Sequence, residues 1–179
     1  MAEEATYSLW FRPFGEVGFE LKEQIKEISK HYNAPFFQPH VTLLGNLKEN
    51  QTELVQLTET LAHSLKPFTI YLEKGDIDDT YFHSLFVNVR KTEPLMDAHN
   101  VAKELFDIDE DTAYSPHLSL LYGKQTKKEK YKLLNIMGRS FNMQFDVHSV
   151  LLIKTDEDVN KWKKIHNAEF KKHHLEDDF

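Results

Sequence analysis

The sequence predicts an α+β fold in which two similar halves share one core. The spacing of apolar residues along the chain alternates between two, as in strands, and about 3.6, as in helices. The order of these segments repeats after 77 residues, the separation between His40 and His117. We therefore expect two β-α-β-α-β halves, about residues 5–74 and 80–154, related by a pseudo-twofold axis within a single domain over residues 1–179.

The first half is predicted to contain three strands and two helices. Apolar residues at i, i+4 and i+7 predict the first helix, and Asn50 with Glu53 resembles a capping box that opens the second. Gly45 closes the middle strand, and Gly75 begins the turn that leaves this half. The expected elements are, in order, strand 7–11, helix 18–31, strand 39–44, a helix from 51 to about 65, and strand 68–72.

The second half repeats this order and is followed by a last helix. Thr126 with Glu129 is a second capping box, and Gly123 closes the strand before it. Alternating apolar residues that begin at Met143 run on into an apolar segment, and we interpret them as one strand. The expected elements are strand 81–89, a helix around 95–105, strand 116–122, helix 127–138, strand 143–153, a helix that faces the core through Val159, Trp162 and Ile165 or His166, and a polar tail over 171–179.

Charge and residue composition exclude several classes of function. With 22 Lys and Arg against 29 Asp and Glu, the net charge of −7 argues against a protein that binds extended nucleic acid through many phosphate contacts. The absence of cysteine excludes disulfides, thiol nucleophiles and Cys-ligated metals. No apolar run approaches the roughly 18–20 residues of a membrane span, and the acidic first residues do not resemble a signal peptide. We expect a cytoplasmic monomer that does not bind membranes.

Two short segments repeat the same word at the same place in each half. Residues 39–45 read PHVTLLG, and residues 116–123 read PHLSLLYG. A bare His-x-Ser/Thr pattern is expected about once by chance in a chain with ten histidines, so alone it means little. The longer word, with Pro before it and two Leu after it, is far rarer. Its duplication indicates a function.

The motif strands can bring two imidazoles and two hydroxyls into one cleft. Residues i and i+2 of a strand point the same way, so His40 shares a face with Thr42, and His117 with Ser119. One histidine can take a proton from water while the other donates a proton to a departing alkoxide. The hydroxyls can donate hydrogen bonds to phosphate oxygens. Such a set can hydrolyse a phosphodiester without a metal.

Other interpretations of the histidines compete with this one. A lone histidine in an apolar strand is more often a core or surface residue, and this applies to each motif taken singly. A zinc site on His40 and His117 would need a third protein ligand, and no His-Glu-x-x-His cluster is present. Words typical of P-loops, dinucleotide-binding turns and hydrolase nucleophile elbows are also absent. We therefore expect no metal and no cofactor.

The two motifs resemble the paired His-x-Thr/Ser signatures of the 2H phosphoesterase superfamily. Within that superfamily, four segments are similar to the cyclic nucleotide phosphodiesterase branch found in plants and yeast: residues 7–10, 39–42, 116–122 and 154–156. The likeness is spread over about residues 5–160. It implies a bilobal α+β fold whose motifs flank a central cleft, and metal-independent opening of a cyclic phosphate.

The resemblance also implies a substrate class and residue roles. Enzymes of this branch hydrolyse ADP-ribose 1″,2″-cyclic phosphate, a by-product of tRNA splicing, to ADP-ribose 1″-phosphate. They also open nucleoside 2′,3′-cyclic phosphates to 2′-phosphates. By this likeness His40 and His117 are the acid–base pair, while Thr42 and Ser119 bind phosphate oxygens.

By the same resemblance, Trp10 and Tyr122 line the pocket for the base or ribose. Tyr122 follows His117 by five residues, so strict alternation places it on the opposite strand face unless a twist or bulge intervenes near Gly123. Trp10 is equally consistent with a core aromatic residue. The cysteines common in the branch are absent here, so a disulfide-controlled loop is not expected.

Two other functions also fit the paired motifs. A 2H enzyme can act on RNA ends, as a 2′,5′ RNA ligase or phosphodiesterase, although the net charge of −7 disfavours a basic RNA track. A noncatalytic module that binds nucleotides or RNA ends would keep the cleft without turnover. The near symmetry of the halves does not reveal which histidine is the base and which the acid.

Overall fold

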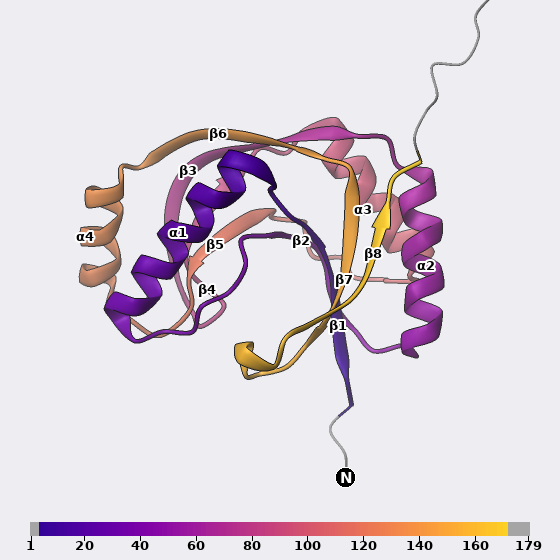
Figure 1. Ribbon diagram of the computed structural model, residues 1–179, viewed down its shortest axis with the longest axis horizontal. Helices are drawn as coiled ribbons and strands as arrows, with labels where there is room; N and C mark the ends of the chain where they lie inside the picture. Colours follow the sequence, from indigo (N-terminus) through magenta and orange to yellow (C-terminus); the bar gives the residue numbers. More distant parts are fainter. Residues whose placement is uncertain (1–3, 172–179) are drawn as a thin grey trace, which may run out of the picture.

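The computed structural model describes residues 4–171 and shows one eight-stranded sheet with helices packed on it (Figure 1). Neighbouring strands are antiparallel throughout, in the order β6-β3-β4-β5-β2-β1-β7-β8. The strands are β1 (Thr6–Phe11), β2 (Val41–Leu47), β3 (Phe68–Thr80), β4 (His83–Val89), β5 (His117–Leu121), β6 (Ser140–Val147), β7 (Ser149–Thr155) and β8 (Lys163–Glu169). The helices are α1 (Gly15–Tyr32), α2 (Gln51–Ser64), α3 (Glu93–Leu105), α4 (Lys127–Met137) and the short 3₁₀ helix η1 (Val159–Lys161).

The α+β class and the repeated order of elements are confirmed. The order β1-α1-β2-α2-β3 is followed by β4-α3-β5-α4-β6, and the two motif strands, β2 and β5, are neighbours in the sheet. The repeats also exchange strands: β3, which ends the first, pairs with β4, and β7, near the end of the second, pairs with β1. The assignment of residues 1–179 to one domain with a lobe for each repeat stays a prediction.

The sheet uses its two faces differently. One face is covered by the helices: α1 packs on β5 and β6, α2 on β7 and β8, α3 on β2, and α4 on β3. Val41 and Leu43 of β2 are fully buried in the core on this face. In Figure 1, α1 and α4 lie on one side of the molecule and α2 and α3 on the other. His40 and Thr42 alternate with these core residues and line a cavity on the opposite face of the strand.

Side-chain caps begin the two helices for which the sequence predicts them, α2 and α4. Thr126 and Glu129 form the predicted capping box at the start of α4, with the Thr126 hydroxyl accepting from the Glu129 amide. At α2 the observed cap is simpler, because the Asn50 side chain accepts from the Thr52 amide.

Two glycines predicted to end strands lie inside them, so those two boundaries were wrong. β2 runs through Gly45 to Leu47, and β3 runs through Gly75 to Thr80. A Cβ atom at Gly75 would clash with the Leu134 side chain of α4. This glycine therefore permits close packing of the helix on the strand rather than a turn.

The predicted last helix was wrong, and so was the continuous strand before it. Only η1 is helical, and the following residues form β8, which pairs with β7 through Val150–Ala168 and Leu152–His166. The three-residue apolar spacing mimicked a helix, but strand pairing at the sheet edge prevailed. β6 and β7 are separate strands that lie at different places in the sheet.

Among the described helices, none combines the length and the apolar character needed to cross a membrane. The predicted polar tail lies, beyond Lys171, outside the described residues.

Candidate active site

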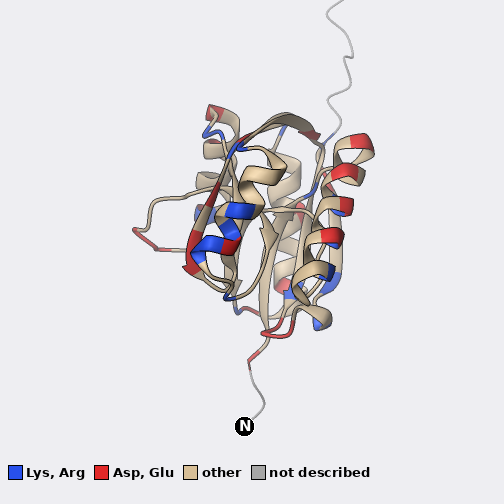
Figure 2. Cartoon of the chain, turned by 90° about the vertical axis from the view of Figure 1, so that its left-hand side faces the viewer, with Lys and Arg blue, Asp and Glu red and all other residues tan. Residues whose placement is uncertain are grey.

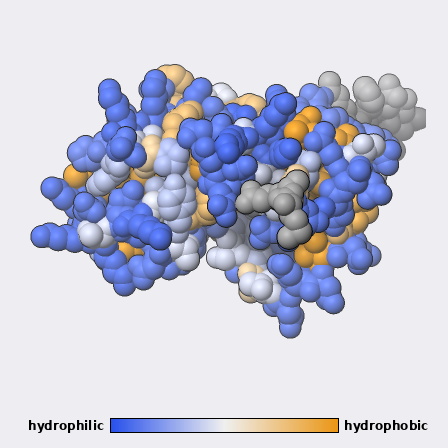
Figure 3. Space-filling view, turned by 90° about the horizontal axis from the view of Figure 1, so that it is seen from below, coloured by the Kyte–Doolittle hydropathy of each residue, from blue (hydrophilic) through white to orange (hydrophobic). Residues whose placement is uncertain are grey.

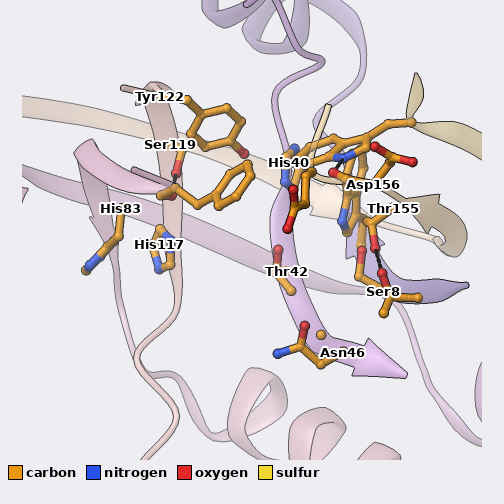
Figure 4. A pocket seen from close by; sticks show the side chains of 16 residues that line it. Ser8, His40, Thr42, Asn46, His83, His117, Ser119, Tyr122, Thr155 and Asp156 are labelled. Atoms are coloured by element: carbon orange, nitrogen blue, oxygen red, sulfur yellow. Dashed lines mark hydrogen bonds between the residues drawn. The ribbon is translucent and has the colours of Figure 1, made fainter. Parts of the chain in front are cut away.

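A cavity of about 580 Å³ lies over the two motif strands. Seen from below, the molecular outline is notched near its middle (Figure 3). All six predicted site residues line this cavity, so the fold brings them together: Trp10, His40, Thr42, His117, Ser119 and Tyr122. Figure 4 shows His40 and Thr42 across the cavity from His117, Ser119 and Tyr122.

The motif strands β2 and β5 pair in the sheet with Val41 opposite Leu118. Because the strands are antiparallel, this register sets His40 across from Ser119, and Thr42 across from His117. Each half therefore supplies one imidazole and one hydroxyl, and each imidazole lies opposite the hydroxyl of the other half.

Both imidazoles are oriented in the same way by the backbone. His40 Nδ1 lies 2.7 Å from the carbonyl oxygen of Gln38, and His117 Nδ1 lies 3.0 Å from that of Ser115. A carbonyl oxygen only accepts, so Nδ1 must be the protonated nitrogen in each ring. Nε2 is left with its lone pair in both neutral rings, free to exchange a proton with a ligand.

His40 is buried against Trp10. The two rings stack with centroids 3.5 Å apart at 9°, and the His40 side chain is 5% exposed. Burial lowers the pKa of His40 to about 3, because the cation would lose its hydration there. This ring is therefore neutral near pH 7.

His117 is more open and has a second histidine beside it. Its pKa is also lowered, first by burial and then by the nearby His83, while the hydrogen bond to Ser115 opposes the shift. The His83 and His117 ring centroids are 4.3 Å apart. His83 stacks on Phe86, and its Nδ1 lies 3.1 Å from Asp78 Oδ2.

Trp10 belongs both to the cavity and to the packed interior. It clusters with Leu151 and Ile153 and meets Trp162 edge to face, with ring centroids 5.4 Å apart. The two interpretations of Trp10 from the sequence are thus compatible, since one face of the indole supports His40.

Tyr122 reaches the cavity because β5 contains a bulge. Phe86 is opposite Ser119, yet Leu85 is opposite Leu121, so one extra residue of β5 lies between these pairs. The extra residue shifts the alternation, and Tyr122 then points to the same side as Ser119. Burial raises the pKa of Tyr122, which keeps its phenol protonated.

Several cavity residues were missed by the sequence reasoning. Thr6 and Ser8 precede Trp10 at strand spacing, a signal that could have found them, and the Thr6 hydroxyl lies 2.9 Å from that of Thr155. The others come from turns and from the ends of strands, for which the sequence offered no comparable signal: Gly45, Asn46, Phe82, His83, Thr155, Asp156, Glu157 and Trp162.

The charge of the cavity wall is limited. Asp156 and Glu157 are the carboxylates among the described lining residues, and no Lys or Arg occurs among them. Over residues 4–171, no three His, Cys, Asp or Glu side chains gather closely enough to hold a metal ion. On the face drawn in Figure 2, Lys and Arg are intermixed with Asp and Glu and form no continuous basic band.

Comparisons with known proteins agree with this geometry. Residues 5–170 match the family model described as cyclic phosphodiesterase-like protein. The chain is 27% identical over 166 residues to a cyclic phosphodiesterase of Arabidopsis thaliana, covering 89% of this chain and 92% of that protein.

Solved structures show the same fold at low sequence identity. TT0787 of Thermus thermophilus aligns with a TM-score of 0.68 and 17% identity over 94% of this chain and all of that one. Escherichia coli LigT complexed with 3′-AMP aligns with a TM-score of 0.63 and 15% identity, over 94% and 99% of the two chains. The expected 2H phosphoesterase fold is thereby confirmed.

Proposed function

The chain belongs to the cyclic phosphodiesterase-like protein family and is a cyclic phosphodiesterase, and we propose that paired histidines carry out its reaction without a metal. The substrates proposed are nucleoside 2′,3′-cyclic phosphates, opened to 2′-phosphates, and ADP-ribose 1″,2″-cyclic phosphate, opened to ADP-ribose 1″-phosphate. One observation carries the proposal: His40 and His117 line the same cavity, and equivalent backbone hydrogen bonds leave Nε2 free in both. Acid–base catalysis of this reaction needs such a pair.

Differences in burial favour His40 as the base and His117 as the acid. His40 is neutral near pH 7, whereas His117 is less buried and regains a proton from solvent more easily. His40 Nε2 takes a proton from water as the water oxygen bonds to phosphorus. The bond from phosphorus to the ribose 3′ oxygen breaks, and His117 Nε2 donates its proton to that oxygen. Exchange of one proton with solvent at each ring then restores the starting state.

The substrate itself supplies the charge that this assignment needs. A cyclic phosphate diester carries one negative charge, and the described cavity lining has no Lys or Arg to balance it. A bound anion raises the pKa of a nearby imidazole, so a histidinium becomes the balancing cation. Substrate binding thereby offsets the lowering of the His117 pKa that burial causes.

The remaining cavity residues fit supporting roles. The Thr42 and Ser119 hydroxyls lie on the faces of their strands that carry the histidines, where they can donate to the phosphate oxygens that are not displaced. Trp10 holds the His40 ring by stacking, and Tyr122 offers its ring and phenol to the sugar or base.

Hydrolysis of 2′,3′-cyclic AMP with EDTA present tests the proposal, with products separated by chromatography. The wild type should form 2′-AMP, and His40→Ala and His117→Ala should each lose about 10²–10⁴-fold in rate. His148→Ala, at an exposed histidine outside the cavity, is the matched control and should keep full activity. An absolute need for a divalent metal, or activity that persists in both cavity variants, would refute the mechanism. A higher kcat/KM for oligonucleotides with cyclic ends would instead favour an enzyme of RNA ends.

A further inference from the structure

A second cavity, of about 280 Å³, lies beside the catalytic cleft and differs from it in charge. The two cavities share Trp10 and Trp162 as lining residues. The second is also lined by Arg12, Lys163 and Lys164, and no acidic residue occurs among its described lining residues. We call it the cationic pocket. In a chain with a net charge of −7, such a concentration of positive charge is unexpected.

Local structure brings these three cations together. Arg12 follows the end of β1, two residues after Trp10, and Lys163 and Lys164 begin β8. Within residues 4–171, none of the three forms an ion pair with a carboxylate. Unpaired cations beside aromatic walls suit a ligand that carries an anionic group.

The cationic pocket is also close to the reacting groups. Trp10 separates it from His40, against which the indole stacks at 3.5 Å between ring centroids. Arg12 Nη2 donates to Gln38 Oε1 at 3.0 Å, and the Gln38 carbonyl accepts from His40 Nδ1. The two cavities are therefore neighbours that share Trp10 and Trp162, so a ligand bound in the cleft lies beside the cationic pocket.

We propose that the cationic pocket binds a second phosphate of the substrate through Arg12, Lys163 and Lys164. This inference rests on the proposed function and deepens it. The preferred substrate is then a cyclic phosphate that also carries a phosphate monoester or diphosphate at the far side of its ribose. The catalytic cleft binds the singly charged cyclic phosphate, and the cationic pocket binds the second phosphate.

Arg12 gives the proposal a second consequence. Its charge is one of the influences that lower the pKa of His40, after burial and His117. An anion bound at Arg12 offsets that influence, so an occupied pocket makes His40 a somewhat stronger base.

The test compares two substrates that differ only in the second phosphate: 2′,3′-cyclic AMP and its 5′-phosphorylated derivative. The wild type should favour the phosphorylated one by about tenfold or more in kcat/KM, as two or three charge-assisted contacts would give. The double variant Lys163→Gln/Lys164→Gln should lose most of this preference. Lys161→Gln, at a lysine of η1 outside both cavities, is the matched control and should keep it. Because each variant is judged by the ratio of its kcat/KM values for the two substrates, a general loss of activity does not affect the result.

A wild-type ratio of one or less, or a ratio unchanged in the double variant, would overturn the inference while leaving the proposed function intact. If neither substrate is hydrolysed by the wild type, the proposed function fails instead. Binding then decides the inference on its own: calorimetry with His117→Ala should show tighter binding of adenosine 2′,5′-bisphosphate than of 2′-AMP, and equal affinities would refute it.

Discussion

The burial of His40 should make the free energy of unfolding depend on pH, and the substitution His40→Gln should remove that dependence. His40 has a pKa of about 3 in the folded chain, against an ordinary value of 6.5. Below pH 6.5 the unfolded chain therefore binds a proton at this site that the folded chain does not bind. The stabilisation is fully present above pH 6.5 and is lost as the pH falls toward 3.

The size of the effect follows from the two pKa values. Each unit of pH between them changes the free energy of unfolding by about 1.4 kcal/mol. Lowering the pH from about 7.5 to about 5 should therefore remove about 2 kcal/mol through His40 alone. In His40→Gln, which has no ionisable group here, that part of the loss should vanish.

Urea unfolding of wild type and His40→Gln at the two pH values measures this difference directly. The double difference isolates His40 because every other residue is the same in both proteins. His148→Gln, at an exposed histidine, should retain the wild-type pH dependence. Equal losses in wild type and His40→Gln, within about 0.5 kcal/mol, would refute the reasoning from burial.

Three further predictions concern the supports of the site. Trp10→Ala should destabilise the chain by about 3 kcal/mol in urea unfolding and raise the pKa of His40 in an NMR titration, because water then reaches the ring; an unchanged titration would contradict this. His83→Phe keeps a ring stacked on its neighbour but removes the imidazole, so the pKa of His117, the proposed acid, should rise and the alkaline limb of the rate profile should move to higher pH. Gly75→Ala should cost about 1–3 kcal/mol, since its Cβ would clash with a leucine of α4; unaltered thermal unfolding would show that the helix yields.

The sequence sufficed for the parts of the site that depend on strand periodicity. The two motif strands alternate between core and cleft, and that alternation alone predicts that His40 and Thr42 share one face and His117 and Ser119 another. Their proximity across the two halves followed from the repeat, which is a property of the whole chain.

Features that depend on packing between distant segments could not be predicted. Gly75 is typical of a turn in the sequence, but here its lack of a side chain lets α4 pack closely on β3. That helix begins about fifty residues later in the chain. Trp162 fits a helical stripe, yet it leads into a strand because β7 offers an open edge. Tyr122 depends on a bulge, and one extra residue in a ladder has no local sequence signature.

The exchange of strands between the repeats makes each half depend on strand pairing with the other. β3 completes the part of the sheet that carries His117, and β7 completes the part that carries His40. Cleavage near residue 80 would separate β3 from β4 and β1 from β7. Each released half would then expose the unpaired edge of a strand. The duplication visible in the sequence therefore does not yield two portable modules. Each copy supports the part of the sheet that carries the other's candidate catalytic histidine, so neither is expected to fold alone.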